Sequence, residues 1–379
     1  MHASLFHLED QALIPHNRNN DENYQQAQLV IALASEQSYF TQQQIEKLHA
    51  HFSAAQIVYS STAGEIYQEF IIEDTLMVIA LRFEKTNIAT ACVNIGELKN
   101  SYNAAKQLAE LLPKDALKHI MIFSDGNQVN GSQLVKGLNE ATQGLVKITG
   151  GLAGDGARFE KTLVGLNELP KEGNIAAIGF YGDSIQITHG VHGGWEPFGP
   201  ERIITHSTEN KLLEIDDKNA LDLYKNYLGD DVKHLPASAL LYPLSISMPD
   251  SSYPLVRTIL RINEEEKSMV FAGELPVGSK VRLMKSNSSS ITTAAALAVQ
   301  SILEGGATSP EFVFVVSCIG RKLMLGNRAE EELETINQNF PGTTVIAGYY
   351  SYGEIAPFPN EKNCQLHNQT ITLTSFYEI

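Results

Sequence analysis

Three steps of glycine followed by an acid come after matching strand-like runs, and each could bring charge to the end of a strand. They are Gly64-Glu65, Gly154-Asp155 and Gly353-Glu354. Carboxylates gathered at one point can bind Mg²⁺ or the amino group of an amino acid. The backbone amides of tight glycine turns can hold an anion. The further side chains that could join such a site are Asp125 and Ser351.

A glycine followed by an acid also has a plain structural explanation. Glycine adopts backbone angles that other residues avoid, and a neighbouring carboxylate can accept hydrogen bonds from turn amides. A tight turn alone therefore explains any single copy. Three copies at matching positions favour a shared role, because ligand crevices in α/β proteins form at strand ends.

The same succession of elements leads to each glycine-acid step. An apolar run typical of a buried strand comes first, a helix-like stretch follows, and a second strand-like run ends at the step. The predicted first strands are 29–33, 119–123 and 312–316, the helices 42–52, 131–144 and 327–340, and the second strands 56–59, 146–149 and 344–347. Asn327 and Glu330 have the spacing of a capping box. A repeat of this kind decides the fold, and its three equivalent ends could face one pocket.

Further strands are predicted after each step, at 75–83, 174–180 and 368–376. Strand–helix–strand connections make parallel pairs and hairpins make antiparallel ones, so the sheets should be mixed. We therefore predict an α/β (mixed α+β) fold of repeated β-α-β-hairpin units forming mixed sheets in two domains. Other predicted elements are helices at 102–112, 219–228 and 288–303, the last capped by serine, and an antiparallel meander over 255–284.

Composition limits the class of partner. Of the 379 residues, 28 are basic and 44 are acidic, which gives a formal net charge of −16. This balance argues against nucleic acid or an anionic membrane surface as the main partner. No apolar run has the length of a transmembrane helix, and the start lacks the pattern of a signal peptide. The three cysteines, Cys92, Cys318 and Cys364, lack CxxC spacing and cannot all pair, which favours the reducing cytoplasm.

No complete catalytic constellation is visible. The sequence has no Gly-x-Ser-x-Gly elbow, no HExxH motif and no Walker lysine, and the glycine run at 150–156 does not fit GxGxxG. No His/Cys/Asp cluster has the spacing of a structural zinc site. We therefore predict a binding protein without catalytic residues rather than an enzyme.

Several separated motifs, taken in order, resemble the FIST sensory-domain family. They are Ser61-Thr62-Ala63-Gly64-Glu65-Ile66, the glycine run 150–156, Gly194-Trp195-Glu196-Pro197-Phe198-Gly199 and Ser351-Tyr352-Gly353-Glu354-Ile355-Ala356-Pro357. The resemblance places a FIST N-type domain at 27–217 and a C-type domain at 218–379, after a loose leader at 1–26. It implies a stand-alone cytoplasmic sensor of a small ligand, which needs a signalling partner. The sequence leaves open whether the chain forms a homodimer.

Stand-alone FIST proteins include nitric-oxide-sensing haemoproteins, which this chain resembles in length and in lacking other domains. That resemblance implies haem b as cofactor and nitric oxide as the gas ligand. It also implies regulation of a histidine kinase in a two-component system, with effects on biofilm formation.

Haem binding needs an apolar slot and usually an axial ligand. His192 is the first candidate for the iron, because it lies in a glycine-rich bend, and Trp195 with Phe198 could form the apolar wall. Two further histidines are candidates: His189 and His367. Each histidine could instead be solvated or bonded to a backbone carbonyl.

The alternative prediction is a sensor of a small amino acid or related metabolite, without haem. In that case Glu65, Asp155 and Glu354 would meet a cationic group, while turn amides would hold an anion.

Overall fold

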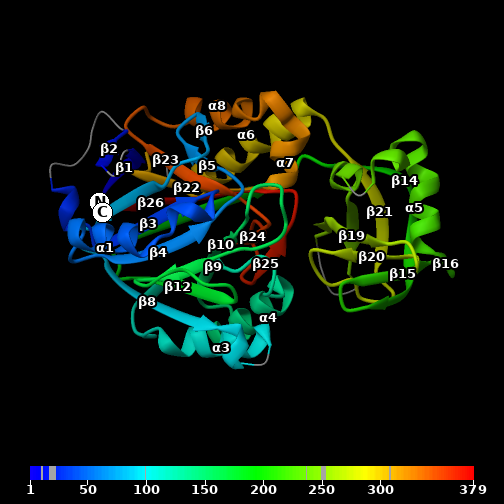
Figure 1. Ribbon diagram of the computed structural model, residues 1–379, viewed down its shortest axis with the longest axis horizontal. Coiled ribbons are helices and arrows are strands. Elements are labelled where there is room, and N and C mark those ends of the chain that lie inside the picture. Colours follow the sequence, from blue (N-terminus) through cyan, green and yellow to red (C-terminus); the bar gives the residue numbers. More distant parts are fainter. Residues whose placement is uncertain (10–11, 17–22, 99, 236, 249–252, 307–308) are drawn as a thin grey trace.

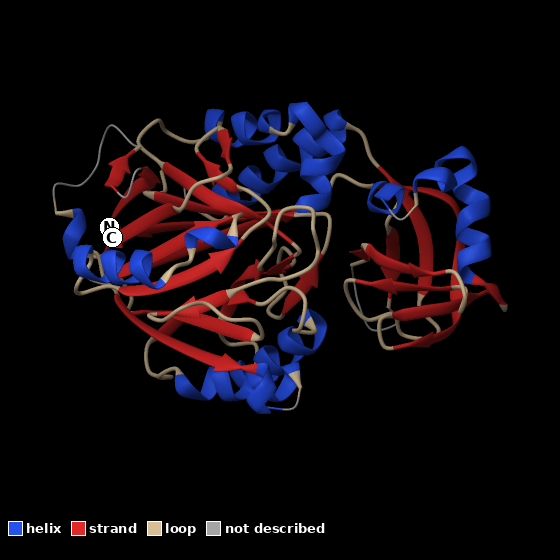
Figure 2. Cartoon of the chain, in the orientation of Figure 1, coloured by secondary structure: helices blue, strands red, loops and turns tan. Residues whose placement is uncertain are grey.

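A computed structural model describes residues 1–9, 12–16, 23–98, 100–235, 237–248, 253–306 and 309–379. The chain forms two bodies that are joined by two connecting segments (Figure 1). The larger body holds three six-stranded sheets, and the smaller body holds one eight-stranded sheet. Helices cover the outside of the sheets (Figure 2). The predicted mixed α and β architecture is confirmed.

The predicted strand–helix–strand unit is present three times. Its parallel pairs are β3 (Leu29–Ala34) with β4 (Gln56–Ser61), β9 (Leu117–Ser124) with β10 (Lys147–Leu152), and β22 (Phe312–Cys318) with β23 (Val345–Ser351). The connecting helices are α1 (Gln42–His51), α4 (Gly131–Thr142), and α7 (Ile319–Leu325) followed by α8 (Glu330–Gln338). An antiparallel strand lies beside the first strand of each unit: β7 (Met77–Arg82), β12 (Asn174–Tyr181) and β26 (Ile371–Glu378).

Each unit also sends a short strand into the sheet of another unit. These exchanged strands follow the glycine-acid steps: β5 (Glu65–Tyr67) pairs with β23, β24 (Gly353–Pro357) pairs with β10, and β11 (Val164–Leu166) pairs with β4. The exchange closes a ring, since the first unit gives to the third, the third to the second and the second to the first. The glycine-acid steps are therefore the places where the chain passes between sheets.

Further strands and helices complete the larger body. The strands are β1 (His2–Glu9), β2 (Ala12–Pro15), β6 (Phe70–Ile72), β8 (Asn87–Asn94), β13 (Ile185–His192) and β25 (Cys364–His367). The helices are α2 (Ile95–Leu98), α3 (Ser101–Leu111) and α6 (Ser288–Glu304), with short 3₁₀ turns at η1 (Tyr24–Gln26), η2 (Gln37–Tyr39) and η5 (Gly326–Arg328).

The core of the larger body lies between the three sheets. A central cluster takes apolar side chains from all of them, including Phe123, Phe180, Phe314 and Tyr349. The outer faces are also buried, under α1 for the first sheet, α3 and α4 for the second, and α6 and α8 for the third. Because both faces of the central strands are buried, these strands are continuous apolar runs rather than alternating ones.

The smaller body runs from 196 to 285. Its strands are β14 (Glu196–Thr208), β15 (Lys211–Ile215), β16 (Lys218–Asn219), β17 (Leu244–Ser247), β18 (Leu255–Arg257), β19 (Ile259–Asn263), β20 (Ser268–Phe271) and β21 (Lys280–Lys285). They are accompanied by α5 (Ala220–Leu228), η3 (Gly229–His234) and η4 (Ala237–Leu241). The predicted meander is present only in part, because β21 pairs with β14 and β17 instead of β20.

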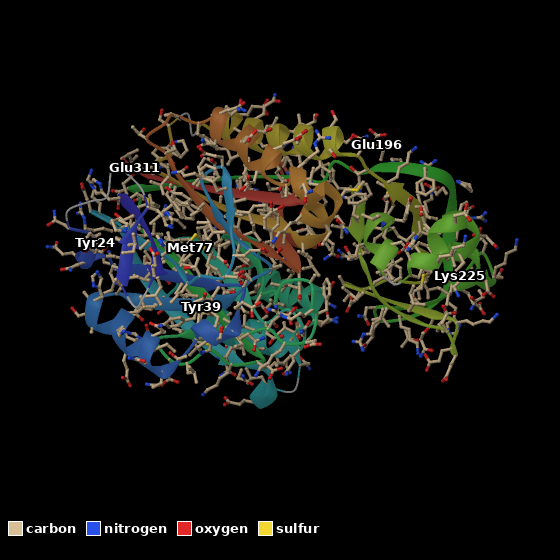
Figure 3. All side chains as sticks on the ribbon, turned by 45° about the horizontal axis from the view of Figure 1, so that its top comes forward. Tyr24, Tyr39, Met77, Glu196, Lys225 and Glu311 are labelled. Atoms are coloured by element: carbon tan, nitrogen blue, oxygen red, sulfur yellow. The ribbon has the colours of Figure 1, made fainter. Side chains whose placement is uncertain are left out.

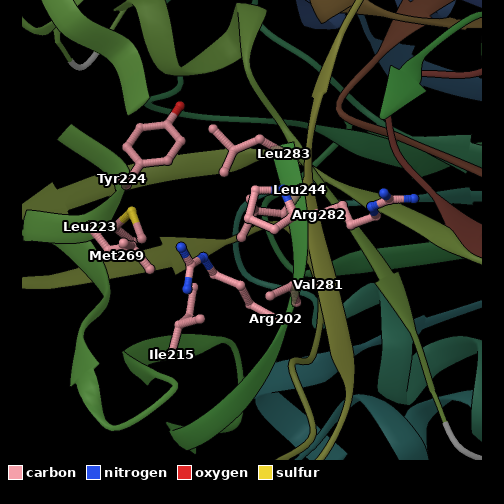
Figure 4. A pocket seen from close by; sticks show the side chains of 10 residues that line it. Arg202, Ile215, Leu223, Tyr224, Leu244, Met269, Val281, Arg282 and Leu283 are labelled. Carbon is pink, nitrogen blue, oxygen red and sulfur yellow. The ribbon is translucent and has the colours of Figure 1, made fainter. Parts of the chain in front are cut away.

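The interior of the smaller body is filled. Side chains from its strands and from α5 surround a cavity of about 10 Å³ (Figure 4). A space of that size holds at most a single water molecule. A ligand would therefore have to bind outside this core.

The start of the chain differs from the predicted loose leader. β1 pairs with β7, and Leu5 and Phe6 are buried in the core. Of the predicted leader, residues 10–11 and 17–22 lie outside the described residues. Residues 2–9 mix polar and apolar side chains without regular alternation, so the sequence pattern gives only a weak signal for this strand.

Two predicted helix caps are wrong. Ala329 precedes α8 and gives no side-chain cap, because Asn327 lies in the preceding 3₁₀ turn. Asn287, not a serine, caps α6 by accepting a hydrogen bond from the amide of Ser290.

The predicted boundary at 217–218 falls inside the smaller body, between β15 and α5. The connecting segments between the bodies instead follow β13 and β21. Glu196, the first residue of β14, lies at this junction (Figure 3).

Candidate functional site

The three bends that carry the glycine-acid steps converge and bond directly to one another. The amide of Gly154 donates to Ser61 O (3.1 Å), that of Ala63 to Tyr350 O (2.8 Å) and that of Tyr352 to Leu152 O (3.2 Å). The exchange of strands brings them together. Their meeting point is packed backbone, so convergence here does not by itself make a receptor cavity.

The glutamates at this convergence are buried and satisfied by hydroxyl groups. Glu65 accepts from the hydroxyl groups of Thr62 and Ser35. Burial raises the pKa of Glu65 to about 8. A carboxyl group with that pKa is mostly neutral at pH 7 and would attract an ammonium group only weakly.

Glu354 shows the same arrangement. Its side chain accepts from Ser351 Oγ at 2.6 Å and from Thr370 Oγ1 at 2.8 Å. Burial raises its pKa to about 7. Ser351 is therefore engaged with this glutamate.

The two aspartates cap turns. Asp155 accepts from the amides of Phe159, Glu160 and Lys161, and from the Tyr352 hydroxyl. Asp125 accepts from the amides of Asn127, Gln128 and Gly173. Each carboxylate thus has the local structural role that a single glycine-acid step would explain.

A cleft with room for a ligand lies where the two bodies meet. This junction cleft has a volume of about 320 Å³. Its lining includes Val191, His192, Gly193, Gly194, Trp195, Ser245, Tyr253, Pro254, Val256, Met284, Phe358, Pro359, His367 and Thr370. His367 comes from a different part of the sequence than His192 and Trp195, and all three line this same cleft.

The walls of the junction cleft are rich in aromatic side chains. Tyr253 of the smaller body stacks on Phe358 of the larger body, with ring centroids 4.8 Å apart. Trp195 stands on a connecting segment, and its Nε1 donates to Gln369 O at 2.9 Å. Phe198, the other predicted wall residue, packs in the core of the smaller body near Tyr242 instead.

The imidazole of His192 is turned toward α6. Its Nε2 lies 3.4 Å from Ser301 Oγ, a long contact for a hydrogen bond. Gly190, two residues earlier on β13, also lies tightly against α6 at Ala298. Residues two apart on a strand share a face, so this face of β13 is the one that packs on α6. Burial lowers the pKa of His192, and the nearby Arg321 lowers it further.

His367 lines the cleft with its protonation defined by one hydrogen bond. Its Nε2 lies 2.9 Å from Ala356 O. A carbonyl oxygen only accepts, so Nε2 carries the proton and Nδ1 carries the lone pair. Burial lowers the pKa of His367 to about 4, and Arg257 also lowers it, so the ring is neutral at pH 7. An imidazole that donates to a carbonyl through one nitrogen is arranged as metal-binding histidines usually are.

His189 faces the opposite side of β13 from His192. Burial lowers its pKa to about 4, with a smaller contribution from Lys147. It does not line the junction cleft.

Sequence reasoning missed several cleft residues. Tyr253, Met284 and Phe358 lie on loops or strand ends with no shared periodicity. One signal was available: an aromatic residue followed by proline occurs on each side of the cleft, as Tyr253-Pro254 and Phe358-Pro359. Proline restricts the residue before it to extended conformations, which suits a wall that presents a ring.

The fold has two bodies with a cleft at their junction. The chain belongs to the FIST family, since the FIST N domain model matches residues 28–218 and the FIST C domain model matches residues 220–357. FIST domains are signalling sensor domains that bind small ligands. The family resemblance predicted from sequence is therefore confirmed.

Other comparisons add little about chemistry. No curated protein matches the chain. A cyanuric acid hydrolase from A. caulinodans is similar over 94% of this chain and 91% of its own, at 9% identity and a TM-score of 0.38. A likeness that weak carries no argument about activity. Among the described residues, no helix is long and apolar enough to cross a membrane.

Proposed function

We propose that this chain is a sensor that binds haem in the junction cleft, senses nitric oxide there and regulates a partner histidine kinase in the cytoplasm. One observation carries the proposal: His192, Trp195 and His367, chosen from sequence as haem-site residues, line a single cleft.

The cleft suits a flat apolar ligand. Tyr253, Phe358, Trp195 and Met284 supply apolar surface, and the histidines supply nitrogen donors. Ligand pockets measure about 300–1,000 Å³, so the present volume is at the lower end. Haem in this cleft would contact both bodies, with Tyr253 and Met284 on one side and Phe358 on the other.

His367 ranks ahead of His192 as the candidate axial ligand. The lone pair of His367 is on Nδ1, and its ring is oriented by Ala356 O. The ring of His192 is turned toward Ser301. Haem, when bound, would supply an iron that takes nitric oxide. The chain would orient the ring through Ala356 and exclude water with the aromatic walls.

Haem reconstitution tests the proposal. Purified protein is titrated with haem, desalted and followed by its visible spectrum, before and after nitric oxide is added. A retained Soret band that shifts with nitric oxide is expected. His367→Ala should change the spectrum most, and His206→Ala, an exposed histidine of the smaller body, is the matched control.

Two results would contradict this assignment. If haem washes off the wild-type chain during desalting, haem is excluded as the ligand. Spectra unchanged in both His367→Ala and His192→Ala would move the haem away from this cleft.

The partner can be tested separately. A histidine kinase encoded near this chain should change its autophosphorylation rate when the haem-loaded protein is added, and nitric oxide should alter that change. A ligand shifts such an equilibrium only by its differential affinity for two states. Identical rates with and without nitric oxide would contradict the signalling step.

The amino-acid alternative gains no support from the bends. Their acids are buried and hydrogen-bonded within the turns, and two have raised pKa values. A thermal-shift screen with amino acids addresses it directly, because a ligand at about 100 times its Kd adds about 2.7 kcal/mol to stability.

A further inference from the structure

A buried turn joins the junction cleft to the rest of the molecule. This turn, called the 367–370 turn here, consists of His367, Asn368, Gln369 and Thr370, all buried. Gln369 adopts a left-handed backbone with φ of 63°, although it is not glycine. Such a conformation persists only where surrounding contacts hold it, and it often marks a functional segment.

Among the described residues, half of the hydrogen bonds between the bodies fall on the residues that flank His367. Gln369 Nε2 donates to Leu240 O of the smaller body at 3.0 Å. Arg257 Nη1 of the smaller body donates to Leu366 O at 2.8 Å. Two others lie away from the turn: Gln133 of α4 donates to Glu274, and the amide of Glu274 donates to Ser132 Oγ at 3.4 Å. Any displacement of His367 therefore acts on two of these four hydrogen bonds.

The same turn reaches the connecting segment and the converged bends. Trp195 Nε1 donates to Gln369 O. The amide and hydroxyl of Thr370 donate to Glu354 Oε2 at 3.1 and 2.8 Å. Four parts of the molecule thus meet at four consecutive residues: the cleft, the connecting segment, the smaller body and the bend of the third unit.

Two polar groups where the bodies meet lack hydrogen-bond partners. Gln369 Oε1 is buried without a hydrogen-bond donor, and so is Arg257 Nε without an acceptor, among the described residues. Burial lowers the pKa of Arg257 to about 10. Buried polar groups without partners disfavour the arrangement that buries them, so separation of the bodies would return both groups to water. The closed arrangement is consequently one that a ligand can stabilise.

We infer that the 367–370 turn couples occupancy of the junction cleft to the position of the smaller body, with Gln369 as the positioning residue. The inference rests on the proposed ligand site in the cleft. A ligand that engages His367 holds residues 366 and 369 in place, and these hold the smaller body. Loss of the ligand frees the turn, the smaller body and the Trp195 segment together.

Gln369→Gly is the direct test. Glycine keeps the left-handed backbone and the Trp195 bond to the carbonyl, but it removes the bond to Leu240. The matched control is Gln143→Gly, since Gln143 also has a left-handed backbone (φ of 55°) and its side chain is exposed at the end of α4. Because Trp195 is the only tryptophan in the chain, its fluorescence reports on this junction.

In ligand-free protein, Gln369→Gly should increase acrylamide quenching of Trp195 and the radius of gyration from small-angle X-ray scattering. Gln143→Gly should match wild type in both measurements. With haem, the Kd of Gln369→Gly should rise about tenfold, the effect of losing one hydrogen-bonded contact. The decrease in radius of gyration that haem causes in wild type should be absent in this variant.

Quenching and scattering of Gln369→Gly that equal those of wild type, with and without haem, would overturn the coupling. Wild-type protein that fails to bind haem would contradict the proposed function instead, while the ligand-free comparison still tests the Gln369 contact. If Gln369→Gly does not fold, Gln369→Asn serves, because its amide is too short to reach Leu240. The same increases in acrylamide quenching and in radius of gyration are expected for Gln369→Asn. Values equal to those of wild type again overturn the inference.

Discussion

At the residue scale, two buried arginines show how differently one charge can be accommodated. Arg321 donates through Nε to Glu332 at 2.8 Å, and Ser317 supports the same glutamate. Arg321 also bonds to the carbonyls of Gly193 and Ile291, next to the two connecting segments. Arg257 has a single hydrogen bond and no paired carboxylate among the described residues.

The two arginines should therefore respond differently to replacement by methionine. Arg321→Met leaves Glu332 buried without its cation and should cost about 3–5 kcal/mol of stability. Arg257→Met removes one hydrogen bond and one unpaired buried charge, so the change should stay within about 1 kcal/mol. Urea denaturation followed by Trp195 fluorescence measures both. Equal losses in the two variants would contradict the distinction.

The buried carboxyl group of Glu65 predicts a pH dependence with a defined sign. Its folded pKa of about 8 lies above the ordinary value of 4.5, so the folded state holds the proton more tightly. The stability that this adds is fully present below pH 4.5 and is lost as pH rises through about 8. Glu65→Gln should lose less stability than wild type over that interval.

Thermal unfolding midpoints of wild type and Glu65→Gln, measured at several pH values, provide the comparison. Using the difference between the two proteins cancels other titrating groups, such as His367. A difference that does not change with pH would mean that the carboxyl group is ionised when buried.

At the element scale, the connecting segments depend on close backbone packing. Gly194 has φ of +80°, and a Cβ there would lie 2.5 Å from Ser290 O of α6. Ser286 Oγ of the other connecting segment donates to Gly194 O at 2.6 Å. The two segments are thus held together beside Trp195.

Gly194→Ala should destabilise the protein by about 1–3 kcal/mol through backbone strain and steric conflict. Gly278→Ala is the matched control, since Gly278 has φ of +87° but nothing within 4 Å of the added carbon. The control should cost about 1 kcal/mol and leave Trp195 emission unchanged. Gly194→Ala should also shift that emission, and a shift in neither variant would contradict this role of Gly194.

Most central elements could be predicted from the sequence, because strands buried on both faces form unbroken apolar runs such as Leu29–Ala34. The exchanged strands β5 and β11 could not, since each has three residues and gains its stability from a partner far away in the chain. The orientation of the His192 ring could not be predicted from the sequence either. It depends on how α6 packs on β13, which no local pattern encodes.

At the scale of the whole molecule, the strand exchange makes the larger body indivisible. A fragment of residues 1–217 would contain both parallel strands of the first unit and of the second unit, but it would lack β22 to β26. It should show no cooperative thermal transition and should aggregate, because one sheet is missing and another loses β24 and β25. Residues 196–285, with their own sheet and core, should unfold cooperatively.

Calorimetry and size-exclusion chromatography of the two fragments test this division. A stable monomeric fragment of 1–217 would show that the exchanged strands are dispensable. The result would also decide whether the boundary between the matched FIST N and FIST C domains coincides with a boundary between folding units.

The exchange has a consequence for synthesis. β5 ends at Tyr67, yet the strand it pairs with, β23, begins at Val345. A nascent chain leaves the ribosome from its N-terminus, so β5 has no β23 to pair with until nearly the whole chain has been synthesised. During that interval the apolar edge beside β5 is exposed and prone to aggregate, so a chaperone would have to bind it. A premature stop codon shortly before β23 should therefore abolish the folded protein rather than shorten it.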